Sequence, residues 1–213
     1  MTKKILFNDK YCLTLAVLNG TKTMTRRLLK VPKTCNGTEV YGFNVLTNSL
    51  GTQCVDLVDE NGGVLGSWKP HYEVGEIVAI AQPYKDIYPN ADFEMIGDKF
   101  MTESAGWTNK MFVRADLMPH HIRITDVKME RLRDISEEDC LKEGIIFLES
   151  SLIMGEDAYF FAVKRKVRQM YDNILKFFSS PQRAYADLID KISGKGTWER
   201  NPWVVAYSFE LVD

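Results

Sequence analysis

The stretch Gly20-Thr21-Lys22-Thr23-Met24-Thr25-Arg26-Arg27 decides how the fold of this chain is interpreted. It is rich in threonine and has no helical periodicity, so we predict an extended segment that leads into a strand. Within a few residues it presents an amine, hydroxyl groups and two guanidinium groups. A second stretch, Ser136 to Gly144, adds the carboxylate of Glu143 much later in the chain. Together these groups suit a site for an anionic or amide-bearing polar ligand.

The composition is that of an ordinary globular protein. Hydrophobic residues make up 45% of the 213 residues and charged residues 26%, which excludes a largely disordered chain. No apolar run reaches the roughly 20 residues of a membrane span. The first residues are basic, but Asn8 and Asp9 stand where a signal peptide would continue its apolar stretch. We therefore expect a cytoplasmic protein with a single domain.

We expect neither a metal nor a cofactor. The four cysteines lie far apart and form no C-x-x-C pair, and the three histidines lack the spacing of metal ligands. The segment Ser193 to Thr197 superficially suggests a phosphate-binding loop. It lacks the G-x-x-x-x-G-K-[ST] spacing and precedes a strand rather than a helix, so ATP binding is rejected.

Charge is unevenly distributed along the chain. The net charge of -2 argues against tight nonspecific coating of nucleic acid, yet a local positive potential still attracts phosphates. One basic cluster comprises Lys164, Arg165, Lys166 and Arg168. For any such cluster the alternative is a solvated face without a partner. The larger cluster sets eight basic residues against Asp9 alone between residues 1 and 38: Lys3, Lys4, Lys10, Lys22, Arg26, Arg27, Lys30 and Lys33.

Helices are expected at four places. Asn8 caps one that runs to Leu18, Ser136 caps one that Gly144 ends, and Ser180-Pro181 starts a third with a cap and a first-turn proline. An amphipathic pattern predicts a longer helix over residues 159–178.

Strands are expected where β-branched and aromatic residues alternate with polar ones. The sequence Asp59-Glu60-Asn61-Gly62 predicts a hairpin turn, and residues 83–109 mix Pro, Gly, Asp and aromatics as an inserted loop does. Several short strands with helices between them favour the α+β class, as a small β-barrel decorated by helices. The expected strands cover residues 39–45, 53–58, 63–68, 74–80, 111–115, 122–132 and 204–212.

Three ordered motifs resemble the ASCH domain family. Gly20 to Arg27 is similar to its G-x-K-T-x-T-x-R signature, and Ile122 to Gly144 is similar to its strand-then-helix segment. The stretch from Ile192 to Val204, together with Met118-Pro119, is similar to the phage and mobile-element branch of that family. The resemblance covers about residues 5–212, apart from insertions near 31–70, 84–110 and 147–178. It implies one PUA-like domain over residues 1–213, a small β-barrel with a cleft suited to RNA, a nucleotide or a modified nucleoside.

The resemblance also implies residue roles. Short bacterial members of the family are amidohydrolases that remove the acetyl group of N4-acetylcytidine with a lysine, a threonine and a glutamate. By motif these fall on Lys22, Thr25 and Glu143. A threonine becomes a nucleophile when a neighbouring base takes its proton, and a buried lysine can serve as that base. The carboxylate would orient the lysine or pass a proton to the leaving amine.

The cationic candidates and Glu143 each have a structural alternative. Lys22 and Arg26 either contact phosphate or pair with the acidic helix that contains Glu137 and Glu138. Glu143 stands at a helix end where the dipole does not favour an anion, which predicts a specific partner, either Lys22 or Arg27; the alternative is a solvated glutamate.

The remaining candidates also have alternatives. Thr25 is otherwise a strand residue whose hydroxyl bonds locally. In a regular strand Lys22 and Thr25 face opposite sides, so their meeting requires a bulge, a turn or a curled lysine arm. Trp198 and Trp203 either stack a base or, as we prefer, pack in the core.

Three functions are consistent with these residues. The leading hypothesis is a protein that binds RNA or a nucleoside-like small molecule in a cleft. The second is an amidohydrolase that acts on an acylated cytidine, and the third is a regulatory module whose insertions bind a protein partner. The sequence leaves the oligomeric state open. Ligand contacts are expected from Lys22, Thr23, Arg26, Arg27, Trp198 and Trp203, with Lys22, Thr25 and Glu143 as the catalytic set.

Overall fold

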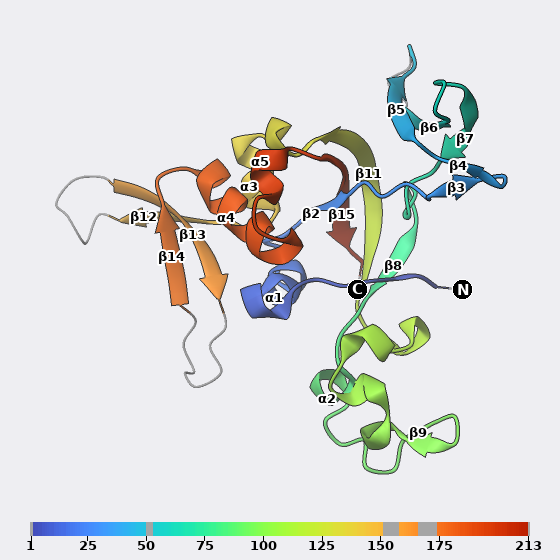
Figure 1. The fold of residues 1–213 in the computed structure, drawn as a ribbon. Coiled ribbons are helices and arrows are strands. Elements are labelled where there is room, and N and C mark those ends of the chain that lie inside the picture. Colours follow the sequence, from blue (N-terminus) through green and yellow to red (C-terminus); the bar gives the residue numbers. More distant parts are fainter. Residues whose placement is uncertain (1, 50–52, 151–157, 166–173, 213) are drawn as a thin grey trace.

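A five-stranded sheet forms the centre of the molecule (Figure 1). The computed structural model describes residues 2–49, 53–150, 158–165 and 174–212. The strand order is β1-β8-β11-β15-β2, in which β1 pairs with β8 in parallel and the other neighbours are antiparallel. The strands are β1 (Lys4–Ile5), β8 (Ile77–Ile80), β11 (His121–Arg131), β15 (Trp203–Leu211) and β2 (Met24–Leu28).

The expected α+β class is confirmed, and the central sheet is open. Strands β1 and β2 form its two edges, and no closed barrel is detected in the described residues. Between the edge strands β1 and β2 the chain forms helical segments, and these two strands do not pair with each other. Strand β15 lies inside the sheet, and its residues Val204 to Tyr207 are buried in succession because both faces are covered.

The three helix starts expected from capping residues are confirmed. The Asn8 side chain accepts a hydrogen bond from the Lys10 backbone N–H and begins η1 (Asp9–Tyr11), which α1 (Leu13–Leu18) follows. Ser136 accepts from the backbone N–H of Asp139 at the start of α3 (Glu137–Lys142). Ser180 caps α4 (Pro181–Ser193) in the same way, and α5 (Thr197–Arg200) comes next. Each such cap stabilises its helix by about 1 kcal/mol.

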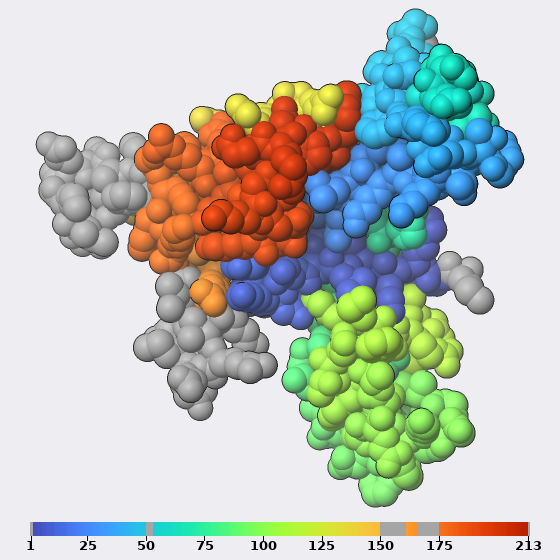
Figure 2. Space-filling model, viewed as in Figure 1, coloured from blue at the N-terminus to red at the C-terminus, as the bar shows by residue number. Residues whose placement is uncertain are grey.

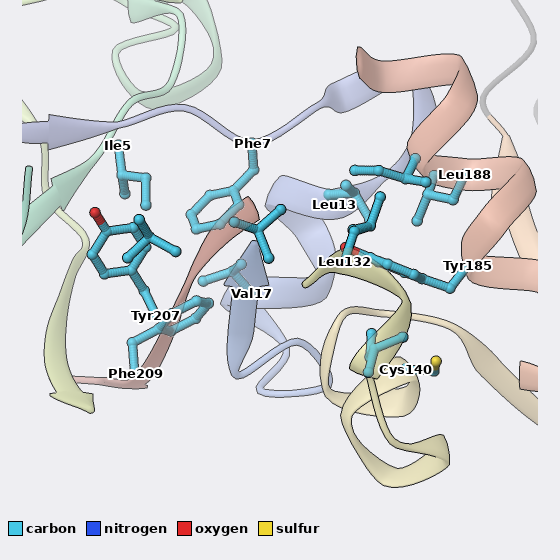
Figure 3. Close-up of a cluster of buried hydrophobic side chains, with 14 of the residues drawn as sticks. Ile5, Phe7, Leu13, Val17, Leu132, Cys140, Tyr185, Leu188, Tyr207 and Phe209 are labelled. Carbon is cyan, nitrogen blue, oxygen red and sulfur yellow. The ribbon is translucent and has the colours of Figure 1, made fainter. Parts of the chain in front are cut away.

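One hydrophobic core joins the sheet to these helices (Figure 3). Phe7 lies against Phe209, with ring centroids 5.7 Å apart, so early and late parts of the chain meet there. Tyr185 and Leu188 reach into the same core from α4. Each fully buried apolar side chain of this size contributes about 1.5–3 kcal/mol.

The expected insertion at residues 31–70 forms two small antiparallel units. The hairpin predicted at Asp59 is confirmed: the Asp59 carboxylate accepts the backbone N–H groups of Asn61 and Gly63, and Gly62 has a φ of 81°. The strands are β3 (Thr34–Cys35) with β4 (Thr38–Glu39), and β5 (Gly42–Thr47), β6 (Gln53–Val58) with β7 (Val64–Trp68).

The second insertion forms a separate lobe with its own small core (Figure 2). The prediction of a strand over residues 111–115 is wrong. The Asn109 side chain accepts a hydrogen bond from the Met111 backbone N–H and starts a tight helical turn instead. Val113 is buried in the lobe's core. The lobe contains α2 (Tyr84–Ile87), β9 (Met95–Ile96), β10 (Lys99–Phe100), η2 (Met101–Glu103), η3 (Ala105–Trp107), η4 (Lys110–Phe112) and η5 (Ala115–Leu117). The remaining short helix of the described chain, η6 (Leu132–Asp134), follows β11.

The prediction of a long helix over residues 159–178 is wrong. Its described parts are strands in the antiparallel sheet β12 (Ile146–Ser150), β13 (Ala158–Arg165) and β14 (Ile174–Phe178). Phe161 pairs with Phe178 across the sheet and lies 5.6 Å from the Phe147 ring. Such aromatic and β-branched side chains fit a pleated surface better than a helix. Lys166 and Arg168 of the expected basic cluster lie outside the described residues.

Among the described residues, no helix combines the length and apolar character that crossing a membrane requires.

Candidate ligand-binding site

Lys22 lies in the turn between α1 and β2, two residues before β2 begins at Met24. Gly20 adopts a φ of 70° there, and the backbone N–H of Lys22 bonds to the Ala16 carbonyl. Since Lys22 precedes β2, the alternation of a regular strand does not separate it from Thr25. Both residues line the same cavity. The turn is therefore what brings the expected pair together.

The Lys22 amine is buried and fully hydrogen-bonded. Nζ donates to the carbonyls of Met24 (2.6 Å) and Glu143 (2.8 Å) and to Oε2 of Glu143 (2.6 Å). The side chain is 1% exposed. Burial lowers the pKa of Lys22, although the Glu143 carboxylate opposes that effect, and Arg27 and Arg26 add to it. Of the two partners expected for Glu143, Lys22 and Arg27, the structure shows Lys22.

Gly144 allows this close approach of α3 to Lys22. Glu143 is the C-terminal cap of α3, and Gly144 follows with a φ of 97°. A Cβ atom at Gly144 would lie 3.3 Å from Leu13 Cδ2 and 3.7 Å from Lys22 Cβ. A glycine both adopts the left-handed backbone and leaves room for these neighbours.

Arg26 extends the ion-pair network across the sheet. Its guanidinium contacts Glu130 (2.7 Å), Asp139 (2.8 Å) and Glu143 (3.3 Å). Burial acts to lower the pKa of Arg26, but the surrounding acidic groups outweigh it and raise the pKa. Arg26 thus pairs with the acidic helix, as its structural alternative predicted. Lys22 and Arg26 have their donors committed to protein acceptors.

A cavity of about 770 Å³ lies beside this network. Thr25 is buried on its wall, and its hydroxyl forms no hydrogen bond with any described residue. Five cationic and two acidic side chains line the cavity, so its lining is positively charged. The lining residues are Leu6, Phe7, Asn8, Asp9, Leu13, Lys22, Thr25, Arg26, Arg27, Leu28, Lys30, Lys110, Glu143, Tyr185, Leu188, Ile189, Ile192 and Ser193.

Tyr185 is a polar cavity residue that the sequence analysis missed. Its hydroxyl is buried without a hydrogen-bond partner among the described residues. Burial, followed by the Glu143 carboxylate, raises the pKa of Tyr185 well above its ordinary value. Figure 3 shows the side chain extending from α4 towards Leu13 and Leu132. A tyrosine on the apolar side of an amphipathic helix carries no sequence signal that separates it from core packing.

Lys110 is the second residue that was missed, and it reaches the cavity from the 84–110 insertion. Its amine donates to Asp9 Oδ1 (2.7 Å), to Thr14 Oγ1 (3.0 Å) and to the Phe7 carbonyl. These contacts tie the lobe to the segment before α1. Residues in an irregular loop give no periodicity from which such a placement follows.

The other expected ligand contacts divide into two groups. Arg27 is exposed and lines the cavity, where Nη2 donates to the Leu6 carbonyl at 2.5 Å. Thr23 does not line it; its backbone pairs with Lys142 and Phe209. Trp198 packs edge-on against Tyr185 at 6.2 Å, and the Trp203 ring faces the Arg131 guanidinium at 4.7 Å. Neither tryptophan belongs to the cavity lining.

No cluster of three or more histidine, cysteine or acidic side chains with metal-binding geometry occurs in the part of the chain that the structure describes. Comparison with family models, with curated proteins and with solved structures finds no match to this chain.

Proposed function

We propose that this chain is an ASCH-type, PUA-like protein whose cavity binds a nucleoside, free or as part of RNA. The observation that carries the proposal is the convergence of two distant motifs on one cavity. Lys22 and Glu143 lie 121 positions apart in the sequence and form a buried ion pair of 2.6 Å, with Thr25 on the same wall. A buried ionisable group with a perturbed pKa and a specific charged partner at a cavity is a candidate for a functional site.

The side chains that can contact a ligand are those whose hydrogen-bonding groups are not already used within the protein. Lys22 and Arg26 are saturated by protein acceptors, so they shape the site rather than hold the ligand. The Tyr185 hydroxyl is buried without a partner among the described residues, and Thr25 and Tyr185 both line the cavity. Hydroxyl groups suit the carbonyl and amine edge of a nucleobase, and Arg27 and Lys30 at the rim suit a phosphate.

Calorimetric titration with cytidine and N4-acetylcytidine tests the binding proposal. We expect saturable binding of at least one nucleoside, weakened about 3–10-fold in Thr25→Val because one hydrogen bond is lost. Thr38→Val is the matched control, since Thr38 is exposed in β4 and does not line the cavity. Absence of nucleoside binding to the folded protein contradicts the proposal.

A second candidate, an amidohydrolase acting on N4-acylated cytidine, is favoured by the environment of Lys22. The lowered pKa of this lysine makes a neutral amine accessible. In the neutral amine one of the three hydrogen bonds that Nζ donates would be given up, and the lone pair so freed can accept the Thr25 proton. Thr25 Oγ1 would attack the amide carbonyl and form an acyl ester. The Lys22 ammonium would return the proton to the leaving cytidine amine, and water would hydrolyse the ester to the free acid. Glu143 would hold the lysine in place.

Chromatographic detection of cytidine and acetate from N4-acetylcytidine tests this second candidate. Turnover that is lost in both Thr25→Val and Lys22→Met, but kept in Thr38→Val, supports it. Nucleoside binding without turnover eliminates the hydrolase and leaves the binding proposal standing.

A further inference from the structure

A second pocket of about 370 Å³ adjoins the cavity. The two share the residues Arg27, Leu28 and Lys30, which lie at the end of β2 and in the segment after it. The far wall of the second pocket comes from Trp68 and Lys69, at the end of β7 in the 31–70 insertion. The full lining is Arg27, Leu28, Lys30, Trp68, Lys69, His71, Tyr72, Val205 and Tyr207.

The polar side of the second pocket is cationic. Arg27, Lys30 and Lys69 are exposed and form no ion pair with any residue that the structure describes. No acidic side chain lines the pocket. Glu76, which lies near His71, is already paired with Lys3 at 2.9 Å. Unneutralised cations on a concave surface attract phosphate.

The apolar side of the second pocket is aromatic and held in place. The rings of Tyr72 and Tyr207 meet edge to face at 5.3 Å. Their hydroxyls are fixed, because Tyr207 accepts the backbone N–H of His71 at 3.2 Å and Tyr72 donates to the Lys4 carbonyl at 2.9 Å. The Trp68 ring is half-buried beside them, which leaves part of it accessible. Nucleobases stack on aromatic rings presented in this way.

From this arrangement we propose that the second pocket receives the nucleotide adjacent to the one in the cavity, so that the ligand is a single-stranded polynucleotide. The inference rests on the proposed nucleoside-binding function of the cavity. The phosphate that links the two nucleotides would lie at the shared wall, beside Arg27 and Lys30, and the second base would stack at Trp68. Trp68 and Lys69 belong to an insertion outside the motifs that resemble the ASCH family.

The test compares N4-acetylcytidine with a pentaribonucleotide that carries N4-acetylcytidine at its centre and uridines elsewhere. Affinities are measured by calorimetric titration, for the wild type, Trp68→Leu, Lys69→Gln and the control Lys99→Gln. Lys99 is exposed in β10 of the separate lobe. Lys69 is exposed, so its substitution leaves the packing intact even if Trp68→Leu perturbs the fold.

We expect the pentanucleotide to bind more tightly than the nucleoside. Trp68→Leu should weaken only the pentanucleotide, by at least about five-fold, the lower end of what an aromatic platform contributes per base. Lys69→Gln should lower the slope of log affinity against log salt by about 0.7 for that ligand. Lys99→Gln should behave as the wild type.

Two outcomes overturn the inference in distinguishable ways. Equal affinity for nucleoside and pentanucleotide, unaffected by Trp68→Leu and Lys69→Gln, removes the second subsite and leaves the cavity proposal intact. Binding of neither ligand removes both proposals.

Discussion

Removal of the Lys22 amine probes the buried ion pair directly. In Lys22→Met the carboxylate of Glu143 loses its 2.6 Å partner while it remains 4% exposed. Breaking a buried pair from one side costs about 3–5 kcal/mol, because the remaining charge is left uncompensated. Arg26, at 3.3 Å from Glu143, offsets part of this loss, so we expect about 2–4 kcal/mol.

The double variant Lys22→Met/Glu143→Leu separates burial of a charge from loss of a contact. Replacing both partners by apolar residues removes the two charges that burial penalises, so we expect it to lie within about 2 kcal/mol of the wild type. It should be more stable than Lys22→Met alone. Arg26 keeps Glu130 and Asp139 in either variant.

Urea unfolding at neutral pH, followed by circular dichroism, measures these differences. With an m-value of about 2 kcal/mol/M, the single variant should lower the midpoint by about 1–2 M. Arg123→Met is the matched control, because the Arg123–Glu210 pair has a similar length of 2.9 Å but exposed side chains. It should lose less than about 1 kcal/mol. A double variant that is no more stable than Lys22→Met, or equal losses in Lys22→Met and Arg123→Met, would refute the reasoning.

Other substitutions test separate features of the structure. Tyr185→Phe should raise the free energy of unfolding by about 1 kcal/mol, because it removes an unpaired buried hydroxyl. The same variant should bind cytidine more weakly in calorimetry. A lower free energy of unfolding contradicts the assignment of an unpaired hydroxyl. Gly144→Ala should lower the free energy of unfolding, measured in urea, by about 1–3 kcal/mol. Gly37→Ala should lower it less, because Gly37 has a similar φ of 84° but an added Cβ there would have no neighbour within 4 Å. Burial raises the pKa of the Cys140 thiol from 9.0 to about 12, so the folded state keeps a proton that the unfolded state loses between these values. From pH 8 to 10.5 the wild type should therefore lose about 2 kcal/mol more than Cys140→Ala, and an equal loss in both refutes the assignment.

Much of the fold follows from short-range signals. The caps at Ser136 and Ser180 and the turn at Asp59 were predicted correctly, because each depends on hydrogen bonds within a few residues. The segment over residues 159–178 was predicted wrongly as one helix. Its aromatic pairs such as Phe161 and Phe178 are formed across strands, and that partnership is invisible to a helical pattern.

The motif residues of the site could be predicted from the sequence, but the other residues that line the cavity could not. The acid at a helix end predicted a specific partner for Glu143, either Lys22 or Arg27, and the structure shows that it is Lys22. The role of Arg26 as a partner of three carboxylates depends on how β2, β11 and α3 meet in space. Tyr185 and Lys110 enter the cavity from elements whose positions only tertiary packing determines.

The position of β15 inside the sheet has a consequence for biosynthesis. β2 pairs with β15 from Met24 to Leu28, and β11 pairs with the other side of the same strand. Ribosomes make β15 after every other strand of this sheet, so β2 remains without its neighbour while the 174 residues between Leu28 and Trp203 are synthesised. A nascent or stalled chain that ends before Trp203 therefore exposes two unpaired strand edges. Such chains are expected to depend on chaperones and to be removed early by proteases.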